Sequence, residues 1–213
     1  MLYIGIDLGT SAVKLLLMDS QGKIQNIVSR EYPIYFPNPG WSEQKPEDWY
    51  EQTMIGIEEL LKDADKSQVA GISFGGQMHG LVILDAQDNV IRPALLWNDG
   101  RTYEECDYLN DVIGKEKLSE YTANISFTGF TAPKILWVKN KEPENFARIA
   151  KIMLPKDYIA AEVPKSMPMY NMFTSFLHVR NAALPNSAMP GIVRGYVFRR
   201  LSPVTFRSTW EYR

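Results

Sequence analysis

The sequence has few of the features that mark secreted or membrane proteins. It contains one cysteine, Cys106, in 213 residues, so no internal disulfide can form and a reducing, cytoplasmic location is expected. No stretch reaches the roughly 18 uncharged apolar residues that a membrane helix needs. The apolar N-terminus is interrupted by Asp7 and Lys14 and has no basic segment before it, which argues against a signal peptide. We therefore expect a protein that neither spans a membrane nor is secreted.

Excess charge and the common nucleotide-binding motifs are also absent. The net charge of −2 at pH 7 gives the whole protein no electrostatic reason to bind nucleic acid or an anionic membrane surface. The sequence contains neither the GxxxxGK[ST] pattern of P-loop proteins nor the GxGxxG pattern of dinucleotide-binding folds. The two histidines, His79 and His178, are far apart in the sequence, so a metal site built on histidine is not expected.

Charge is distributed unevenly along the chain. Residues 1–160 carry 16 basic and 23 acidic side chains, whereas residues 161–213 carry seven basic and two acidic ones and no aspartate. We therefore divide the chain into a domain over 1–160 and a tail over 161–213, whose aperiodic pattern predicts neither helix nor strand. The tail could be an alternative domain, a segment that binds nucleic acid, or unrelated sequence that follows a truncated or frameshifted gene. The last origin explains best the abrupt change of composition.

The first 160 residues show strand and helix patterns in turn. Residues 2–8 alternate apolar side chains with polar or small ones, a period of two that predicts a half-buried strand. Two more strands follow after tight turns and complete an antiparallel meander. A meander followed by alternating helices and strands indicates an α/β domain with a mixed sheet. The patterns predict strands at 2–8, 13–18, 23–30, 69–75, 81–85 and 94–97, and helices at 46–61, 103–112, 132–139 and 143–150.

The first candidate site is the turn after the first strand. Glycine and small hydroxyl residues at such a turn can present backbone N–H groups and hydroxyls to a phosphate. An aspartate beside a phosphate needs a cation between them, and hydrated Mg²⁺ meets that need. The alternative is a hairpin turn whose aspartate caps loop amides. The residues of this phosphate-binding interpretation are Asp7, as magnesium ligand, with Gly9, Thr10, Ser11 and Lys14.

Two further segments place polar groups at expected strand ends. Gly75-Gly76-Gln77-Met78-His79-Gly80 forms a cramped turn at an edge where α/β proteins usually bind ligands. Trp97-Asn98-Asp99-Gly100-Arg101 combines an aromatic wall with amide, carboxylate and guanidinium groups, a mixture that suits a polyol. The alternatives are a surface histidine in the first segment and a helix-capping aspartate in the second.

Six segments in order carry a resemblance to a known family. They are Asp7–Lys14, Pro39-Gly40-Trp41-Ser42-Glu43-Gln44, Gly76–Gly80, Trp97–Arg101, Phe130-Thr131-Ala132-Pro133-Lys134 and Leu154-Pro155-Lys156-Asp157-Tyr158. The series resembles the N-terminal part of the FGGY carbohydrate kinases, and within them the xylulokinase group, over about residues 1–160. The first segment is shared with the wider actin, hexokinase and Hsp70 superfamily. The segments Gly76–Gly80 and Trp97–Arg101 are more specific.

The resemblance implies a fold, a reaction and roles for the candidate residues. The fold is a ribonuclease-H-like domain of the actin and hexokinase superfamily, and the reaction is transfer of a phosphoryl group from ATP to the 5-hydroxyl of xylulose, a ketopentose. Phosphoryl transfer depends mainly on positioning and charge neutralisation. Asp7 would hold Mg²⁺ through water, and the remaining residues of its turn would lie near the phosphate. The sugar pocket would be lined by Met78, His79, Trp97, Asn98 and Asp99, with Gln77 and Arg101 as support.

The resemblance also indicates what this chain does not contain. The family uses an aspartate in a Gly-Gly-Asp context as general base, but the only Gly-Gly pair here is Gly75-Gly76 in the sugar turn. The second domain is missing as well, so we expect a kinase fragment that is inactive alone. Apolar surface left exposed would favour self-association. Alternative functions are a non-catalytic sugar- or nucleotide-binding module and an ATP-gated interaction protein of the actin or Hsp70 kind.

Overall fold

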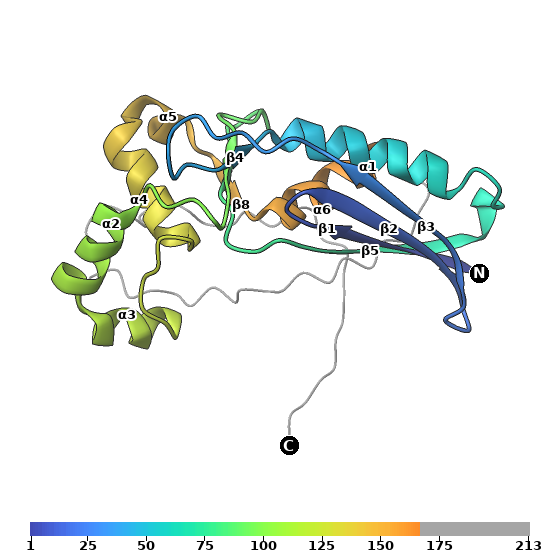
Figure 1. Ribbon diagram of the computed structural model, residues 1–213, viewed down its shortest axis with the longest axis horizontal. Coiled ribbons are helices and arrows are strands. Elements are labelled where there is room, and N and C mark those ends of the chain that lie inside the picture. The colour runs from blue at the N-terminus through green and yellow to red at the C-terminus, as the bar shows by residue number, and fades with distance from the viewer. Residues whose placement is uncertain (167–213) are drawn as a thin grey trace, which may run out of the picture.

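The centre of the fold is a four-stranded mixed sheet in the order β3-β2-β1-β5 (Figure 1). The computed structural model describes residues 1–166, with side chains through Val163, so the predicted tail from residue 167 onward lies outside the described residues. Strands β1 (Leu2–Leu8), β2 (Ala12–Asp19) and β3 (Ile24–Glu31) form an antiparallel meander, and β5 (Val69–Gly76) lies parallel to β1. The predicted meander and mixed sheet are confirmed.

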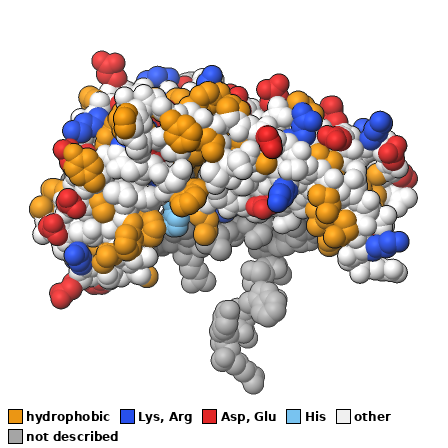
Figure 2. All heavy atoms as spheres, viewed as in Figure 1, with side chains coloured by type: hydrophobic (Ala, Val, Ile, Leu, Met, Phe, Trp, Pro, Cys, Tyr) orange, Lys and Arg blue, Asp and Glu red, His pale blue; other side chains and the backbone are white. Residues whose placement is uncertain are grey.

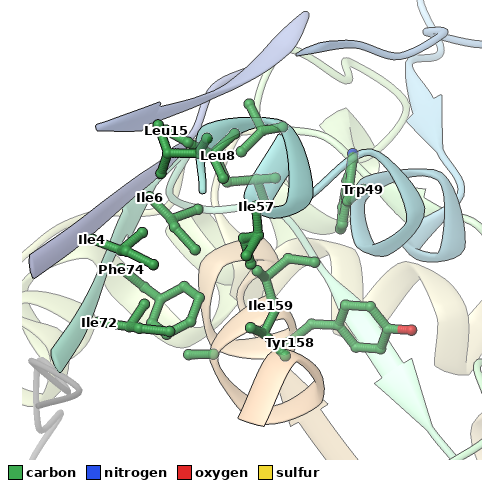
Figure 3. Packing of buried hydrophobic residues seen from close by; sticks show 14 of the residues in the cluster. Ile4, Ile6, Leu8, Leu15, Trp49, Ile57, Ile72, Phe74, Tyr158 and Ile159 are labelled. Carbon is green, nitrogen blue, oxygen red and sulfur yellow. The ribbon is translucent and has the colours of Figure 1, made fainter. Parts of the chain in front are cut away.

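One face of this sheet is covered by two helices. Helix α1 (Pro46–Leu60) packs on β2 and β3, whereas α6 (Pro155–Ser166) packs on β1, β5 and α1. Side chains from alternate strand positions point toward these helices in Figure 3, as their period of two requires. The resulting core contains, among others, Ile4, Ile6, Leu8, Leu15, Ile72 and Phe74 from the strands and Trp49, Ile57, Tyr158 and Ile159 from the helices.

The remaining described elements form a smaller, mostly helical region at one end of the sheet (Figure 1). Two short antiparallel pairs lie between the regions: β4 (Glu43–Gln44) with β7 (Ala94–Leu95), and β6 (Val82–Leu84) with β8 (Lys151–Met153). A short 3₁₀ helix, η1 (Lys66–Gln68), leads into β5. The helical region comprises α2 (Tyr103–Asp107), the π-helical segment η2 (Tyr108–Gly114), α3 (Lys115–Thr122), α4 (Thr131–Lys141) and α5 (Pro143–Arg148).

The structure differs from the sequence prediction in three helices. The helix predicted at 103–112 is α-helical only to Asp107 and continues as a π-helix. Helix α3 was not predicted because it buries only Leu118 and so lacks an apolar stripe. Helix α6 was also not predicted, and the expected boundary near residue 160 falls inside it. Val163 of this helix is fully buried in the main core, so residues 161–166 continue the domain.

The surface of the described region bears on two expectations. None of the helices in residues 1–166 is long and apolar enough to cross a bilayer. On the edge strand β3, Ile24 and Ile27 are 54% and 59% exposed. Unpaired edge strands with apolar side chains are sites of association between copies. Self-association through exposed apolar surface stays a prediction.

The junction between β1 and β5 leaves no room for a side chain at Gly76. A Cβ atom there would lie 2.8 Å from both the Cβ and the carbonyl oxygen of Leu8. We expect Gly76→Ala to lower the free energy of unfolding by about 1–3 kcal/mol, because the two strands must separate. Urea unfolding would measure the change. Gly5→Ala is the matched control in the same sheet, since its Cβ would meet Leu16 Cβ at an ordinary 3.8 Å; equal losses in the two variants would contradict the prediction.

Candidate functional site

The candidate phosphate loop lies where β1 ends, between its two neighbouring strands. Asp7 pairs in register with Lys14 of β2 on one side and with Gly75 of β5 on the other. Asp7 and Lys14 are both exposed, because they occupy the strand positions that face away from the helices. Gly75 leaves the space beside the carboxylate open, since a Cβ there would lie 3.8 Å from Asp7 Oδ1. The end of β1 therefore presents one carboxylate and one ammonium group to solvent.

The loop that follows is held in one conformation by several hydrogen bonds. The Gly9 N–H donates to the carbonyl oxygen of Ala12 at 3.0 Å, which closes the turn. The Tyr32 hydroxyl donates to the carbonyl oxygen of Gly9 at 2.5 Å, and Gln44 Nε2 donates to that of Thr10 at 2.8 Å. Burial and the nearby charge of Asp7 raise the pKa of Tyr32, so its hydroxyl keeps its proton. The loop is preorganised before any phosphate arrives.

Two buried glutamines connect this loop to the turn that carries the predicted sugar residues. Gln77 Nε2 donates to the Gly9 carbonyl oxygen at 3.4 Å and to Gln44 Oε1 at 3.2 Å. The same oxygen of Gln44 accepts a bond from Trp49 Nε1 at 3.1 Å. Gln77 Oε1 is buried, and no hydrogen-bond partner for it occurs in the part of the chain that the structure describes. Gln77 therefore connects the turn at 75–80 to the phosphate loop, and its supporting role in a sugar site stays a prediction.

Trp97 joins the predicted sugar wall to the phosphate loop directly. Its indole Nε1 donates to Thr10 Oγ1 at 2.9 Å, although the two residues are 87 positions apart. Trp97 is 49% exposed and Met78 is 56% exposed, while Asn98 and Ser11 are also exposed. Half-exposed aromatic and apolar side chains beside polar ones are typical of a ligand-binding surface. Figure 2 shows one face of the molecule, with a pale blue histidine beside orange hydrophobic side chains.

His79 has an unusual backbone conformation in the same region. Its φ is 65°, in the left-handed region that residues other than glycine rarely adopt. The imidazole stacks on Phe130 with ring centroids 4.4 Å apart and planes 10° from parallel. Partial burial, together with the charge of Lys134, lowers the pKa of His79. The ring is therefore neutral at physiological pH and can both donate and accept hydrogen bonds.

Asp99 is the predicted sugar residue that the structure encloses most completely. It is 1% exposed, and Oδ2 accepts bonds from the Ser42 N–H at 2.6 Å and Arg101 Nη2 at 2.7 Å. Oδ1 accepts bonds from Arg101 N at 3.0 Å and Arg101 Nε at 2.9 Å. These bonds engage both oxygens of the carboxylate. Asp99 thus braces the loop that carries Trp97 and Asn98.

Arg101 connects this loop to the segment around Glu43. Its Nη2 lies 2.8 Å from Glu43 Oε1, and Glu43 also pairs with Arg92. The Arg101 guanidinium carbon lies 3.7 Å from the centre of the Trp41 ring, a cation–π contact that is strong when desolvated. Arg101 is 6% exposed, and its supporting role in a sugar pocket stays a prediction.

The structure brings some predicted residues together and leaves others apart. Thr10 meets Trp97, Gly9 meets Gln77, and Asp99 meets Arg101, whereas Asn98, Met78, Ser11 and Lys14 are exposed. Sequence reasoning assigned no role to Gln44, Phe130 or Lys134, although it quoted their segments. Gln44 and Lys134 are weak signals in the sequence, because they also bond to Thr10 and His79, which lie 34 and 55 positions away.

The phosphate loop can be tested for its fit to Mg²⁺ and ATP. Within residues 1–166 no group of three or more His, Cys, Asp or Glu residues could hold a metal ion. Mg²⁺ does not need such a cage, because it keeps several waters and binds through one or two carboxylates together with substrate phosphates. One exposed carboxylate, Asp7, beside an open Gly75 fits that mode, and the exposed ammonium of Lys14 suits a phosphate. The residues present are compatible with hydrated Mg²⁺ and with a phosphate group.

Comparison with known proteins gives a consistent result. The model for the FGGY family of carbohydrate kinases, N-terminal domain, matches residues 2–167. Xylulose kinases of Staphylococcus xylosus and Lactococcus lactis are 46% and 48% identical to this chain over 156 and 160 residues. These matches cover 73% and 74% of this chain and 32% of each relative. The chain therefore spans about a third of the length of the curated relatives it matches.

Solved structures show the same relationship. A xyloylose kinase from Brucella ovis matches with a TM-score of 0.70 and 44% identity, over 75% of this chain and 34% of its own. A gluconate kinase from Lactobacillus acidophilus has a TM-score of 0.70 and 28% identity, over 74% of this chain and 32% of its own. The predicted fold of the actin and hexokinase superfamily is confirmed. The chain belongs to the FGGY family of carbohydrate kinases.

Proposed function

We propose that this chain supplies the sugar-binding and phosphate-binding surfaces of a kinase that phosphorylates D-xylulose at its 5-hydroxyl. The observation that carries the proposal is the hydrogen bond from Trp97 Nε1 to Thr10 Oγ1 at 2.9 Å. It places an exposed aromatic wall and a preorganised phosphate loop side by side, as transfer between a sugar and a nucleotide requires. The relatives that are 43–48% identical to this chain carry the name xylulose kinase, which supports xylulose as the substrate.

Each exposed group has a role in this proposal. A C–H face of the sugar stacks on Trp97, while the Asn98 amide and the neutral His79 imidazole bond to hydroxyl groups. Met78 supplies an apolar contact, and Gln77, Asp99 and Arg101 hold these side chains in place. Gly9, Thr10, Ser11 and Lys14 contact the phosphate that is transferred. Asp7 would hold Mg²⁺ through water, and the bound ion would neutralise phosphate charge.

The base that accepts the proton of the attacking hydroxyl is proposed to be absent from these 213 residues. Asp99 is the carboxylate within the sugar segment, but both its oxygens accept hydrogen bonds from Ser42 and Arg101. It has no free lone pair directed at a substrate hydroxyl, so it cannot act as the base. No Gly-Gly-Asp segment occurs in the sequence. On this proposal, binding and phosphate positioning belong to this chain, whereas proton removal and closure belong to a second domain.

The compartment follows from the cysteine content. Cys106 is the lone cysteine of the sequence and is free and buried in the structure. A kinase without disulfides that consumes ATP fits a reducing, ATP-rich compartment, so we propose a cytoplasmic enzyme of xylose use.

Asn98 provides the direct test of the sugar site. We expect D-xylulose to bind the full chain no more tightly than millimolar, because each hydrogen bond to a neutral sugar contributes about 0.5–1.5 kcal/mol. Asn98→Ala should abolish this binding and leave the melting temperature unchanged, since Asn98 is exposed. Calorimetric titration would measure the affinity.

The control for this test is Asn145→Ala. Asn145 lies on α5 and bonds to Glu142, so its loss should leave the affinity for D-xylulose as it is. Equal affinity in Asn98→Ala and the unaltered chain would remove Asn98 from the site. Binding of ATP without any binding of a ketopentose would favour a nucleotide-binding module instead.

A further inference from the structure

A buried lysine holds the sugar turn from behind. Lys134 on α4 is 0% exposed, which is rare for a lysine. Its Nζ donates to the carbonyl oxygen of His79 at 2.8 Å and to that of Gly129 at 2.5 Å. Burial lowers the pKa of this amine to about 7. Burying an amine costs free energy unless it forms hydrogen bonds. The two acceptors of Lys134 belong to the turn at His79 and to the loop at Gly129.

The first loop is the strained turn at His79. The left-handed conformation of this residue, with φ at 65°, is strained and persists only where neighbouring groups enforce it. The carbonyl oxygen of His79 accepts one bond from Lys134 and another from Thr131 Oγ1 at 3.2 Å. The imidazole is held at the same time by its stack on Phe130. Two donors and one ring contact from the same short segment thus enforce the turn.

The second loop leads to Trp97. A Cβ atom on Gly129 would lie 2.4 Å from the carbonyl oxygen of Trp97, so the backbones of the two loops are in close contact. Lys134 anchors Gly129 through its carbonyl oxygen, and it thereby fixes the loop on which the backbone of Trp97 rests. One buried amine is therefore connected to His79 on one side and, through Gly129, to Trp97 on the other.

We propose that Lys134 is a positioning residue that sets the orientation of the His79 imidazole and the placement of the Trp97 wall. The consequence for sugar affinity rests on the function proposed above, whereas the effect on His79 does not. Asp99 and Arg101 are the other charged groups whose fields reach Lys134, but they bond to each other and to the segment around Glu43. Lys134 alone among these three donates to both loop carbonyls.

Proton NMR of the full chain without ligand tests the proposal. A ring stacked face to face on Phe130 experiences an upfield ring-current shift, and the chain contains only two histidines, so the two imidazole signals are easily separated. In Lys134→Met, which retains the length of the side chain, we expect the His79 signal to lose its upfield shift while that of His178 stays in place. The spectra are recorded at about pH 8, where an unperturbed imidazole is neutral.

The control is Lys141→Met on the same helix. Lys141 is exposed and pairs with Glu104 at 3.2 Å, so its removal should move neither signal. An unchanged His79 signal in folded Lys134→Met overturns the proposal.

A second pair of variants covers the case in which Lys134→Met folds but is too unstable for NMR. Glycine adopts the left-handed conformation without strain, so the His79→Gly chain has less need of the carbonyl contacts. We expect Lys134→Met to lower the melting temperature less in the His79→Gly background than in the unaltered chain. Equal losses in the two backgrounds would show that Lys134 only fills space and would overturn the positioning role.

Sugar titration separates this inference from the proposed function. If both hold, Lys134→Met should weaken the binding of D-xylulose about tenfold, the effect of losing one hydrogen bond to a charged group, while Lys141→Met should leave it unchanged. Failure of the unaltered chain to bind D-xylulose would contradict the proposed function. The ligand-free shift of His79 would still decide the role of Lys134.

Discussion

The purified 213-residue chain is expected to form no xylulose 5-phosphate from ATP and D-xylulose above a no-enzyme control. Within residues 1–166, Asp99 is the carboxylate of the sugar segment, and all its lone pairs directed into the site are engaged. The chain spans about a third of the length of its curated relatives, and in the function proposed above closure around the two substrates belongs to a second domain. Alignment of substrates can supply about 7–11 kcal/mol of a barrier, and its loss removes turnover from the measurable range.

A coupled assay for ADP and chromatography of the sugar phosphate would check this result. A full-length xylulose kinase assayed in parallel shows that the conditions support the reaction. The binding of D-xylulose to the same preparation separates an incomplete site from an unfolded one. Formation of xylulose 5-phosphate by the purified chain, lost on mutation of Asp7, would show that this chain contains its own base.

Asp99→Ala is expected to lower the free energy of unfolding by about 3–5 kcal/mol, or to prevent folding. The substitution leaves Arg101 buried beside one remaining carboxylate, Glu43, and it removes the acceptor of the Ser42 N–H. A buried charge that loses a partner carries the full cost of its desolvation. Because domains of this size are stable by only about 5–15 kcal/mol, the loss is a large part of the total.

Urea unfolding followed by circular dichroism would measure the change. The matched control is Glu104→Ala, whose carboxylate pairs with Lys141 while both side chains are more than half exposed. Exposed pairs contribute about 0–1 kcal/mol, so this variant should unfold near the unaltered chain. If Asp99→Ala lost no more stability than Glu104→Ala, Asp99 would not brace the loop.

The strands of the sheet could be predicted because the pattern that marks each strand lies within the strand itself. The alternation of residues 2–8 is a direct consequence of the two faces of β1, and burial at Ile4, Ile6 and Leu8 follows it. Helix α6 was not predicted because the charge composition of the chain changes within it, near residue 160. Val163, after this change, still packs in the core. The π-helical turn after Asp107 depends on tertiary contacts and has no simple sequence pattern.

The candidate residues could be named from the sequence, but the hydrogen bonds that connect them could not. Trp97 and Thr10 were each singled out, yet their hydrogen bond joins residues 87 positions apart, and no local pattern contains that distance. The segment Trp97–Arg101 indicated a polyol site, but whether Asp99 faced a ligand or a guanidinium depended on the position of the neighbouring chain. Lys134 was given no role because its acceptors are backbone carbonyls, which have no sequence pattern, and one of them, that of His79, is 55 positions away.

In the function proposed above, the bond between Trp97 and Thr10 makes the two ligands thermodynamically dependent on each other. A sugar stacked on Trp97 would restrict the indole, and through the 2.9 Å hydrogen bond it would restrict the hydroxyl proposed to contact the phosphate. The entropy lost in ordering this pair is then lost once, on binding of whichever ligand arrives first. By reciprocity, the factor by which nucleotide changes the affinity for the sugar equals the factor by which the sugar changes the affinity for nucleotide. A single side-chain contact thus gives the two half-sites a common free energy of coupling.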